Sequence, residues 1–247
     1  MPSSGGRRMI KKNKRGSQVE IVISFVIFMT FIFFIYLITQ PMLKSERKES
    51  SLENLASRLA EKSLANITSA SVAISATQDC VDLDNFLNVV GNGNRVIVRS
   101  DDGTVLSSGV SGSDLRVGRN GLSFFKVYGS GEFAQETRTI SGCQYLTQGS
   151  GYTLGLVKTT KNIFESKIIG LIGEYNTDYD SLKSELKIPE ENDFDFSFTY
   201  SNGTEILTGN QGQVPTSTIN IYSRNIPIIY TSKQAGFESG LLNVKIW

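Results

Sequence analysis

One uninterrupted apolar stretch constrains this chain more than any other feature. It covers the nineteen residues 21–39, IVISFVIFMTFIFFIYLIT, which carry no charge. A helix of this length spans roughly 28 Å at about 1.5 Å per residue, close to the hydrocarbon thickness of a bilayer. A buried helix of a soluble protein is the alternative, but such helices usually keep a polar residue in every turn. The stretch therefore predicts one transmembrane helix, 18–40, with the lipid bilayer as its partner.

The flanks of this stretch predict its orientation. The cytoplasmic side of a membrane helix carries the excess of Lys and Arg. Three basic residues follow the stretch, offset by Glu46, Glu49 and Glu53, whereas six precede it: Arg7, Arg8, Lys11, Lys12, Lys14 and Arg15. We therefore expect a basic cytoplasmic leader, 1–17, and an extracellular C-terminal part. A cleaved secretory signal fits less well, because the apolar run is long and Thr39-Gln40-Pro41 offers no A-x-A cleavage site.

Charge separates the leader from the rest of the chain. From Gln40 onward there are 19 basic and 23 acidic residues, a formal balance of −4. This balance argues against nucleic acid as a partner of the distal part. The basic leader is instead expected to face an anionic membrane leaflet.

Two cysteines, Cys80 and Cys143, both fall in the part expected outside the cell. In an oxidising compartment two cysteines most simply form one disulfide. That bond would close a loop of 63 residues and contribute about 4 kcal/mol in the chain-entropy model. Asn66-Ile67-Thr68 and Asn202-Gly203-Thr204 are sequons compatible with glycosylation at Asn66 and Asn202.

Chemistry-bearing motifs are missing from the sequence. The chain has no histidine, which excludes Ser-His-Asp and Cys-His sites and His-ligated metals. No phosphate-binding glycine motif is present, and the glycine pairs are typical of turns. Asp193 and Asp195 share one strand face without EF-hand spacing, so a solvated face is expected there rather than calcium. We expect no enzyme, no cofactor and no metal site.

Helical spacing follows the apolar stretch. Pro41 is expected to end or kink the helix. The segment 41–76 predicts an amphipathic stalk helix, with an apolar stripe formed by Leu52, Leu55, Leu59, Ala60, Leu64 and Ile67. Either the head or a neighbouring copy must cover this stripe. If a copy covers it, polar substitutions at Leu52, Leu55 and Leu59 should abolish self-association and leave the head folded.

The remainder predicts an α+β head rich in antiparallel strands. In 77–160 we expect a hairpin around Asp101-Asp102-Gly103, a second around Gly129-Ser130-Gly131, and a strand from Tyr152. In 161–247 we expect a helical hairpin broken at 176–178, and three or four strands. One of these strands is predicted by alternation over 194–200. Whether the two β regions form one sheet stays open.

The start of the chain resembles the class III signal peptides of archaeal type IV pilin-like proteins. The resemblance rests on Lys14-Arg15-Gly16-Ser17-Gln18-Val19-Glu20 ahead of an apolar helix. It implies that a prepilin-type peptidase cuts between Gly16 and Ser17. It also implies that Glu20 pairs with the amino terminus of a neighbouring subunit, which gives a carboxylate in lipid the partner it needs.

The match departs from the family pattern at two positions. Glu20 is fourth after Gly16 rather than fifth, and Ser17 stands where glutamine is common. Two functions are therefore expected. One is a pilin-like or pseudopilin-like structural subunit that assembles with copies of itself or with similar subunits. The other is a monomeric, membrane-tethered extracellular binding or sensing module, held by an uncleaved signal-anchor.

Overall fold

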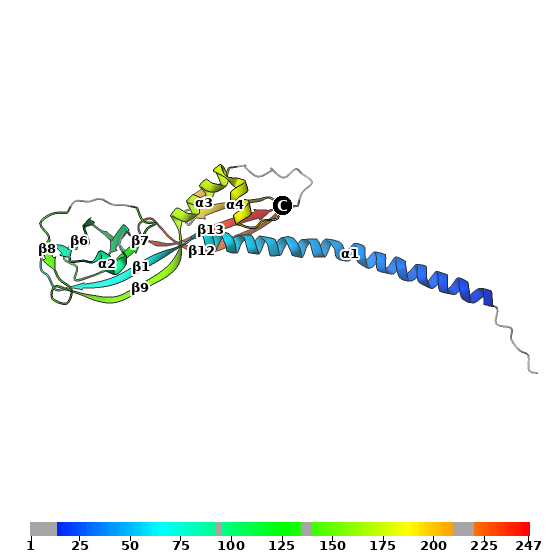
Figure 1. Cartoon of the computed structure of the whole chain (residues 1–247), viewed down its shortest axis with the longest axis horizontal. Helices are drawn as coiled ribbons and strands as arrows, with labels where there is room; N and C mark the ends of the chain where they lie inside the picture. The colour runs from blue at the N-terminus through cyan, green and yellow to red at the C-terminus, as the bar shows by residue number, and fades with distance from the viewer. Residues whose placement is uncertain (1–13, 92–94, 135–139, 210–219) are drawn as a thin grey trace, which may run out of the picture. The chain divides into compact units, whose positions relative to one another are not determined.

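The computed structural model describes residues 14–91, 95–134, 140–209 and 220–247, without the side chains of 14–18 and 40–47. The leader up to residue 13 therefore lies outside the described residues. The chain forms two compact units, Met1–Glu49 and Ser50–Trp247. The fold is α+β, as expected: an N-terminal apolar helix followed by a strand-rich head with helices (Figure 1).

The first helix, α1, runs from Lys14 to Lys62 and does not end at Pro41. Proline removes one backbone donor, yet the helical sequence on either side is long enough to continue. The helix ends where the amide and hydroxyl of Ser63 both donate to the carbonyl of Leu59, at 3.0 and 2.7 Å. The expected stalk helix over 41–76 is therefore wrong beyond Lys62.

A strand, β1 (Leu64–Ile74), replaces the last part of that predicted helix. Leu64 and Ile67 happen to extend the three- and four-residue spacing of the preceding stripe. The stronger signal is the alternation that buries Ala70, Val72 and Ile74 and leaves the small residues Ser71 and Ala73 between them. Such a period of two is typical of a strand with one buried face.

β1 lies near the centre of a nine-stranded sheet of order β11-β10-β13-β12-β9-β1-β7-β3-β4. Its remaining strands are β3 (Arg95–Arg99), β4 (Val105–Leu106), β7 (Phe124–Ser130), β9 (Tyr152–Phe164), β10 (Phe194–Tyr200), β11 (Glu205–Leu207), β12 (Tyr222–Thr231) and β13 (Phe237–Ile246). Strands from both predicted β regions thus meet in this one sheet. A parallel contact of two residue pairs joins them, Tyr230 with Ile163 and Thr231 with Phe164.

One half of the sheet, β11-β10-β13-β12, corresponds to the unit predicted to have three or four strands. It packs against the end of α1 and against α3 (Glu165–Thr177) and α4 (Tyr179–Glu185). The predicted helix break is confirmed, because the side chain of Asp178 caps α4 by accepting from the amide of Ser181. The helix was expected from residue 161, but β9 extends to Phe164 and α3 begins only after it.

The other half, β9-β1-β7-β3-β4, packs against a second sheet of order β5-β6-β2-β8. That sheet comprises β2 (Cys80–Leu83), β5 (Ser108–Ser111), β6 (Asp114–Gly118) and β8 (Gln144–Leu146), and a short helix, α2 (Leu87–Val90), adjoins it. The hairpin predicted around Asp101-Asp102-Gly103 is confirmed as β3–β4. The one predicted around Gly129-Ser130-Gly131 is wrong, because β7 pairs with β1 and β3.

Both covering layers lie on the same side of the nine-stranded sheet. Ile163 and Tyr230 are paired and share one face, and Tyr230 belongs to the core beneath the helices. On β1 and β9 that face carries Val72 and Tyr152, which belong to the core beneath the smaller sheet. We call the opposite side the open face. Among the described residues, a cluster of Ile67, Ile97, Phe133, Phe164 and Ala235 buries part of it.

Candidate anchoring and surface sites

The apolar part of α1 is covered by nothing else in the described chain. The segment Val19–Thr39 has the length and composition needed to cross a membrane, and none of it is buried. Both of its threonine hydroxyls bond within the helix: Thr30 donates to the carbonyl of Val26 at 2.6 Å and Thr39 to that of Ile35 at 2.9 Å. With these backbone bonds the helix presents few unsatisfied polar groups to lipid. It is compatible with a transmembrane or signal-anchor segment.

The predicted processing and assembly residues lie at the start of this helix. Gly16 and Ser17 fall within the first turn of α1, where only the backbone is described. Glu20 is exposed and is the second residue of the apolar segment. Its carboxylate therefore lies at the end of a surface that is otherwise apolar over about five turns.

The leucine stripe belongs to the core of the head. Leu52, Leu55 and Leu59 are 5, 2 and 1% exposed, and they pack with strands β10, β12 and β13. The head's own sheet thus covers the stripe, which leaves no apolar stripe here for a neighbouring copy. Polar substitutions at these leucines would disrupt the head itself, so the expectation that they leave it folded is wrong.

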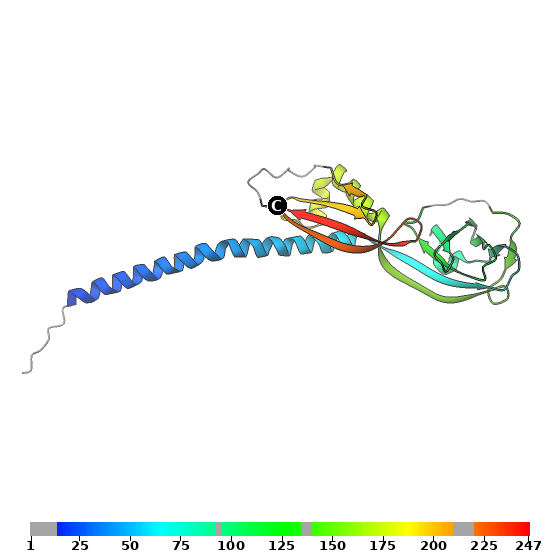
Figure 2. The same ribbon diagram turned by 180° about the vertical axis from the view of Figure 1, so that it is seen from behind.

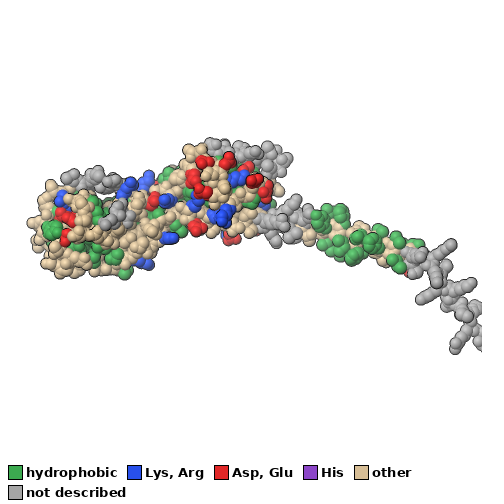
Figure 3. Space-filling view, viewed as in Figure 1, with side chains coloured by type: hydrophobic (Ala, Val, Ile, Leu, Met, Phe, Trp, Pro, Cys, Tyr) green, Lys and Arg blue, Asp and Glu red, His purple; other side chains and the backbone are tan. Residues whose placement is uncertain are grey.

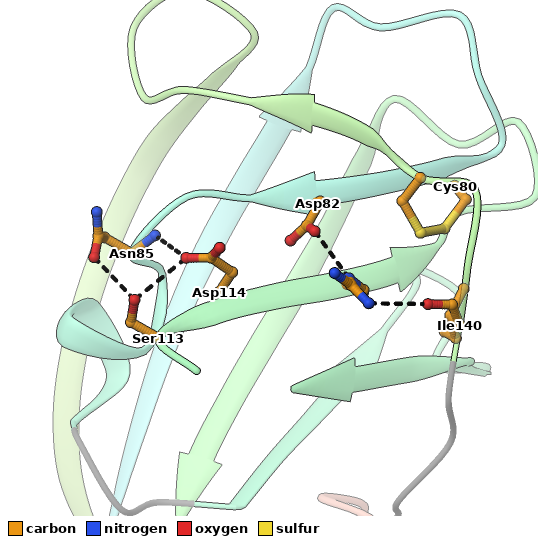
Figure 4. Close-up of polar contacts among 8 residues, drawn as sticks. Cys80, Asp82, Asn85, Ser113, Asp114 and Ile140 are labelled. Carbon is orange, nitrogen blue, oxygen red and sulfur yellow. Dashed lines mark hydrogen bonds and ion pairs between the residues drawn. A yellow bond between two sulfur atoms is a disulfide. The ribbon is translucent and has the colours of Figure 1, made fainter. Parts of the chain in front are cut away.

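The predicted disulfide joins Cys80 and Cys143, with Cα atoms 4.4 Å apart. It ties the segment before β8 to the start of β2. Within the loop that it closes, Arg116 donates to the carboxylate of Asp82 at 2.8 Å and to the carbonyl of Ile140 at 3.4 Å (Figure 4). Asp82 is 8% exposed, and this contact supplies its counter-charge.

A polar cluster lies at the other end of the same sheet. Asn85 and Asp114 are held together by Ser113, whose hydroxyl donates to both side chains at 3.0 and 3.3 Å (Figure 4). Nearby, a hydrogen bond to Asp84 and partial desolvation raise the pKa of Tyr145 to about 12. The side chains of this cluster are therefore bonded to one another.

The two sequons occupy different environments. Asn202 is exposed at the turn between β10 and β11, where its side-chain oxygen accepts from the amide of Thr204 at 2.9 Å and Gly203 adopts a φ of +83°. Asn66 is exposed near the start of β1, where it pairs with Lys161 of β9. Access to a modifying enzyme is therefore easier at Asn202. Glycosylation at either position stays a prediction.

Several described groups have pKa values displaced by their surroundings. Burial first, and then a hydrogen bond to Glu165, raises the pKa of Tyr200 to about 12. Burial likewise raises the pKa of Tyr179 and Tyr230. A hydrogen bond from Ser100 is the main cause that lowers the pKa of Asp102. Every one of these shifts moves the group away from neutrality.

One cleft, of about 460 Å³, lies beside Asn66, and another, beside Leu55 and Pro189, is about 170 Å³. The 460 Å³ cleft is lined by hydroxyl and amide side chains, by valines and other small residues, and by a carboxylate, Glu132. Glu132 is already engaged by Lys167 at 3.1 Å and by the hydroxyl of Ser166 at 2.8 Å. The described residues include no group of three or more His, Cys, Asp or Glu side chains able to hold a metal ion.

The chain matches no protein-family model, no curated protein and no solved structure. Its function must therefore be inferred from its own residues. The sequence did not indicate which strand residues lie on the open face, because that assignment requires the pairing of β9 with β12. Alternation within single strands was the available signal, and it does not say which face a neighbouring layer covers.

Proposed function

We propose that this chain is a membrane-anchored, pilin-like structural subunit with an extracellular α+β head. The observation that carries the proposal is the double role of α1. Its residues 19–39 form an uncovered apolar surface, and the same helix continues to Leu52, Leu55 and Leu59 in the head core. One helix thus supplies both an anchor and part of the folded domain.

Glu20 gives this proposal a specific assembly contact. A carboxylate in lipid is costly unless it is paired, and none of the described basic side chains lies within the apolar segment of the same helix. In the proposal, Glu20 pairs with the new amino terminus of a neighbouring subunit after a prepilin-type peptidase cuts between Gly16 and Ser17. The leader then faces the cytoplasm, and the head lies outside, where the disulfide is stable.

The first experiment is the amino-terminal sequence of the mature protein from native membranes. A start at Ser17 is the expected result, and a start at Met1 or Pro2 would contradict processing. The latter result would favour the monomeric, membrane-tethered binding module.

The second experiment measures self-association after chemical crosslinking in membranes. Glu20→Gln should lose most of the crosslinked oligomers, because it removes the charge. Glu49→Gln is the matched control, since Glu49 is also an exposed glutamate of α1 but lies outside the apolar segment. Equal oligomer yields from the two variants would contradict the assembly role of Glu20.

A further inference from the structure

The open face of the nine-stranded sheet exposes large apolar side chains. Ile229 on β12 is 71% exposed, and Phe237 and Leu241 on β13 are 55 and 43% exposed. The pairing register assigns them to one side, because Phe237 pairs with Thr231, which in turn pairs with Phe164 of the cluster on that side. Figure 2 views β12 and β13 from this side. Several exposed apolar side chains on one face suggest a contact surface.

Basic side chains accompany these apolar residues. Lys126, Lys158 and Lys245 all lie on the open face, by their pairing with Ser71, Ser69 and Asp195. Lys126 and Lys245 form ion pairs with Asp101 and Asp195, at 3.4 and 3.2 Å. Lys158 is exposed and has no ion pair within the described residues, so its charge is available to a partner.

The opposite side of this part of the head is acidic. Residues 174–193 contain seven acidic and two basic residues, and Figure 3 shows acidic side chains gathered over α3 and α4. Lys183 neutralises Asp193 at 3.0 Å, and Lys62 pairs with Glu185. Asp180, Glu190 and Glu191 are exposed and form no ion pair with any described residue.

These two surfaces lie on opposite sides of one head. The helices α3 and α4 cover one face of the sheet, and the open face is the other. We propose that the open face of one head binds the acidic surface of α4 and residues 190–191 on a second copy of this chain. A contact between two different surfaces of identical chains is heterologous, so each added copy leaves one surface of each kind free. The inference rests on the proposed function and specifies the contact between heads that would let a filament grow.

The test uses full-length protein in detergent, with single-cysteine variants. Cys80 and Cys143 are bonded to each other, so an introduced cysteine is the free thiol. Lys158→Cys mixed with Asp180→Cys should give an oxidised dimer of the two, and neither variant alone should. Lys161→Cys is the matched control, because Lys161 is exposed on the same strand but pairs with Asn66 on the other face. Equal crosslinking of Lys158→Cys and Lys161→Cys to Asp180→Cys would overturn the proposal, as would a dominant Lys158→Cys homodimer.

Charge exchange provides an independent measurement. Lys158→Glu alone and Asp180→Lys alone should each weaken association several-fold, and the double variant should restore it, because the opposite charges are then exchanged. Asp79→Lys is the control for charge reversal at an exposed carboxylate beside the disulfide. Raising the salt from about 0.05 to 0.5 M should weaken the wild-type contact. If both single variants associated as strongly as the wild-type protein, the proposed contact between heads would be refuted. If Glu20→Gln still lost its oligomers in that case, the proposed function would stand without the contact between heads.

Discussion

Leu59→Ala is the substitution that best separates a core role of the α1 stripe from a role in contacts between copies. Leu59 is 1% exposed and lies in the core formed by α1, α3, α4 and the four-stranded half of the sheet. Replacement by alanine removes three carbons, worth about 2.4 kcal/mol at ~0.8 kcal/mol for each buried group. The unfilled cavity adds to this cost, so we expect the free energy of unfolding to fall by about 2–5 kcal/mol.

The assay is urea unfolding of full-length protein in detergent, followed by the fluorescence of Trp247, the single tryptophan. Ser57→Ala is the control, because Ser57 is exposed on the same helix two residues earlier. A surface substitution of this kind should change stability by less than about 0.5 kcal/mol. If Leu59→Ala left the unfolding midpoint unchanged and reduced oligomer size instead, the stripe would serve the contact between copies, and the reasoning from burial would fail.

Two further predictions concern covalent and ionisable groups of the head. Replacing both cysteines by serine should destabilise the head by about 4 kcal/mol, since the bond closes 63 residues; an unchanged urea midpoint in unreduced samples would contradict this. The pKa of Tyr200 is raised from 10.0 to about 12 by burial and by its hydrogen bond to Glu165, so folding favours its neutral form. Its stabilising contribution is therefore complete below pH 10 and is lost as the pH rises toward 12. Absorbance titration should show part of this shift disappear in Glu165→Gln, where burial persists; an identical titration curve would disprove the role of the hydrogen bond.

Local patterns predicted most of the elements. The apolar stretch 21–39, the alternation over 194–200 and the Asp-Gly turn at 102–103 each correspond to an observed helix, strand or hairpin. These signals succeed because they depend on residues close in sequence, whose spacing matches the period of the element. The helix break at Asp178 was equally local, since a capping side chain bonds an amide three residues away.

The failures required information from distant residues. Leu64 and Ile67 extend a helical stripe, yet they pair in β1 with Ile163 and Thr160 of β9. Gly129 and Gly131 resemble a turn, but Gly129 pairs with Val96 of β3, and a Cβ there would come within 2.9 Å of Val90. In both places long-range pairing overrides the local preference. Of the candidate site residues, the disulfide alone could be read from the sequence and then found in the structure.

The direct passage from α1 into β1 has a mechanical consequence. Only Ser63 separates the helix from the strand, and β1 extends along β9 through ten registered residue pairs, from Leu64 to Ile74. A force applied between the start of β1 and the start of β9 acts along these two antiparallel strands. It therefore loads the hydrogen bonds between them all together, in shear, instead of breaking them one after another. The head should therefore resist a force applied along β1 and β9. The two-pair contact between β9 and β12 should yield first under a force applied across the strands.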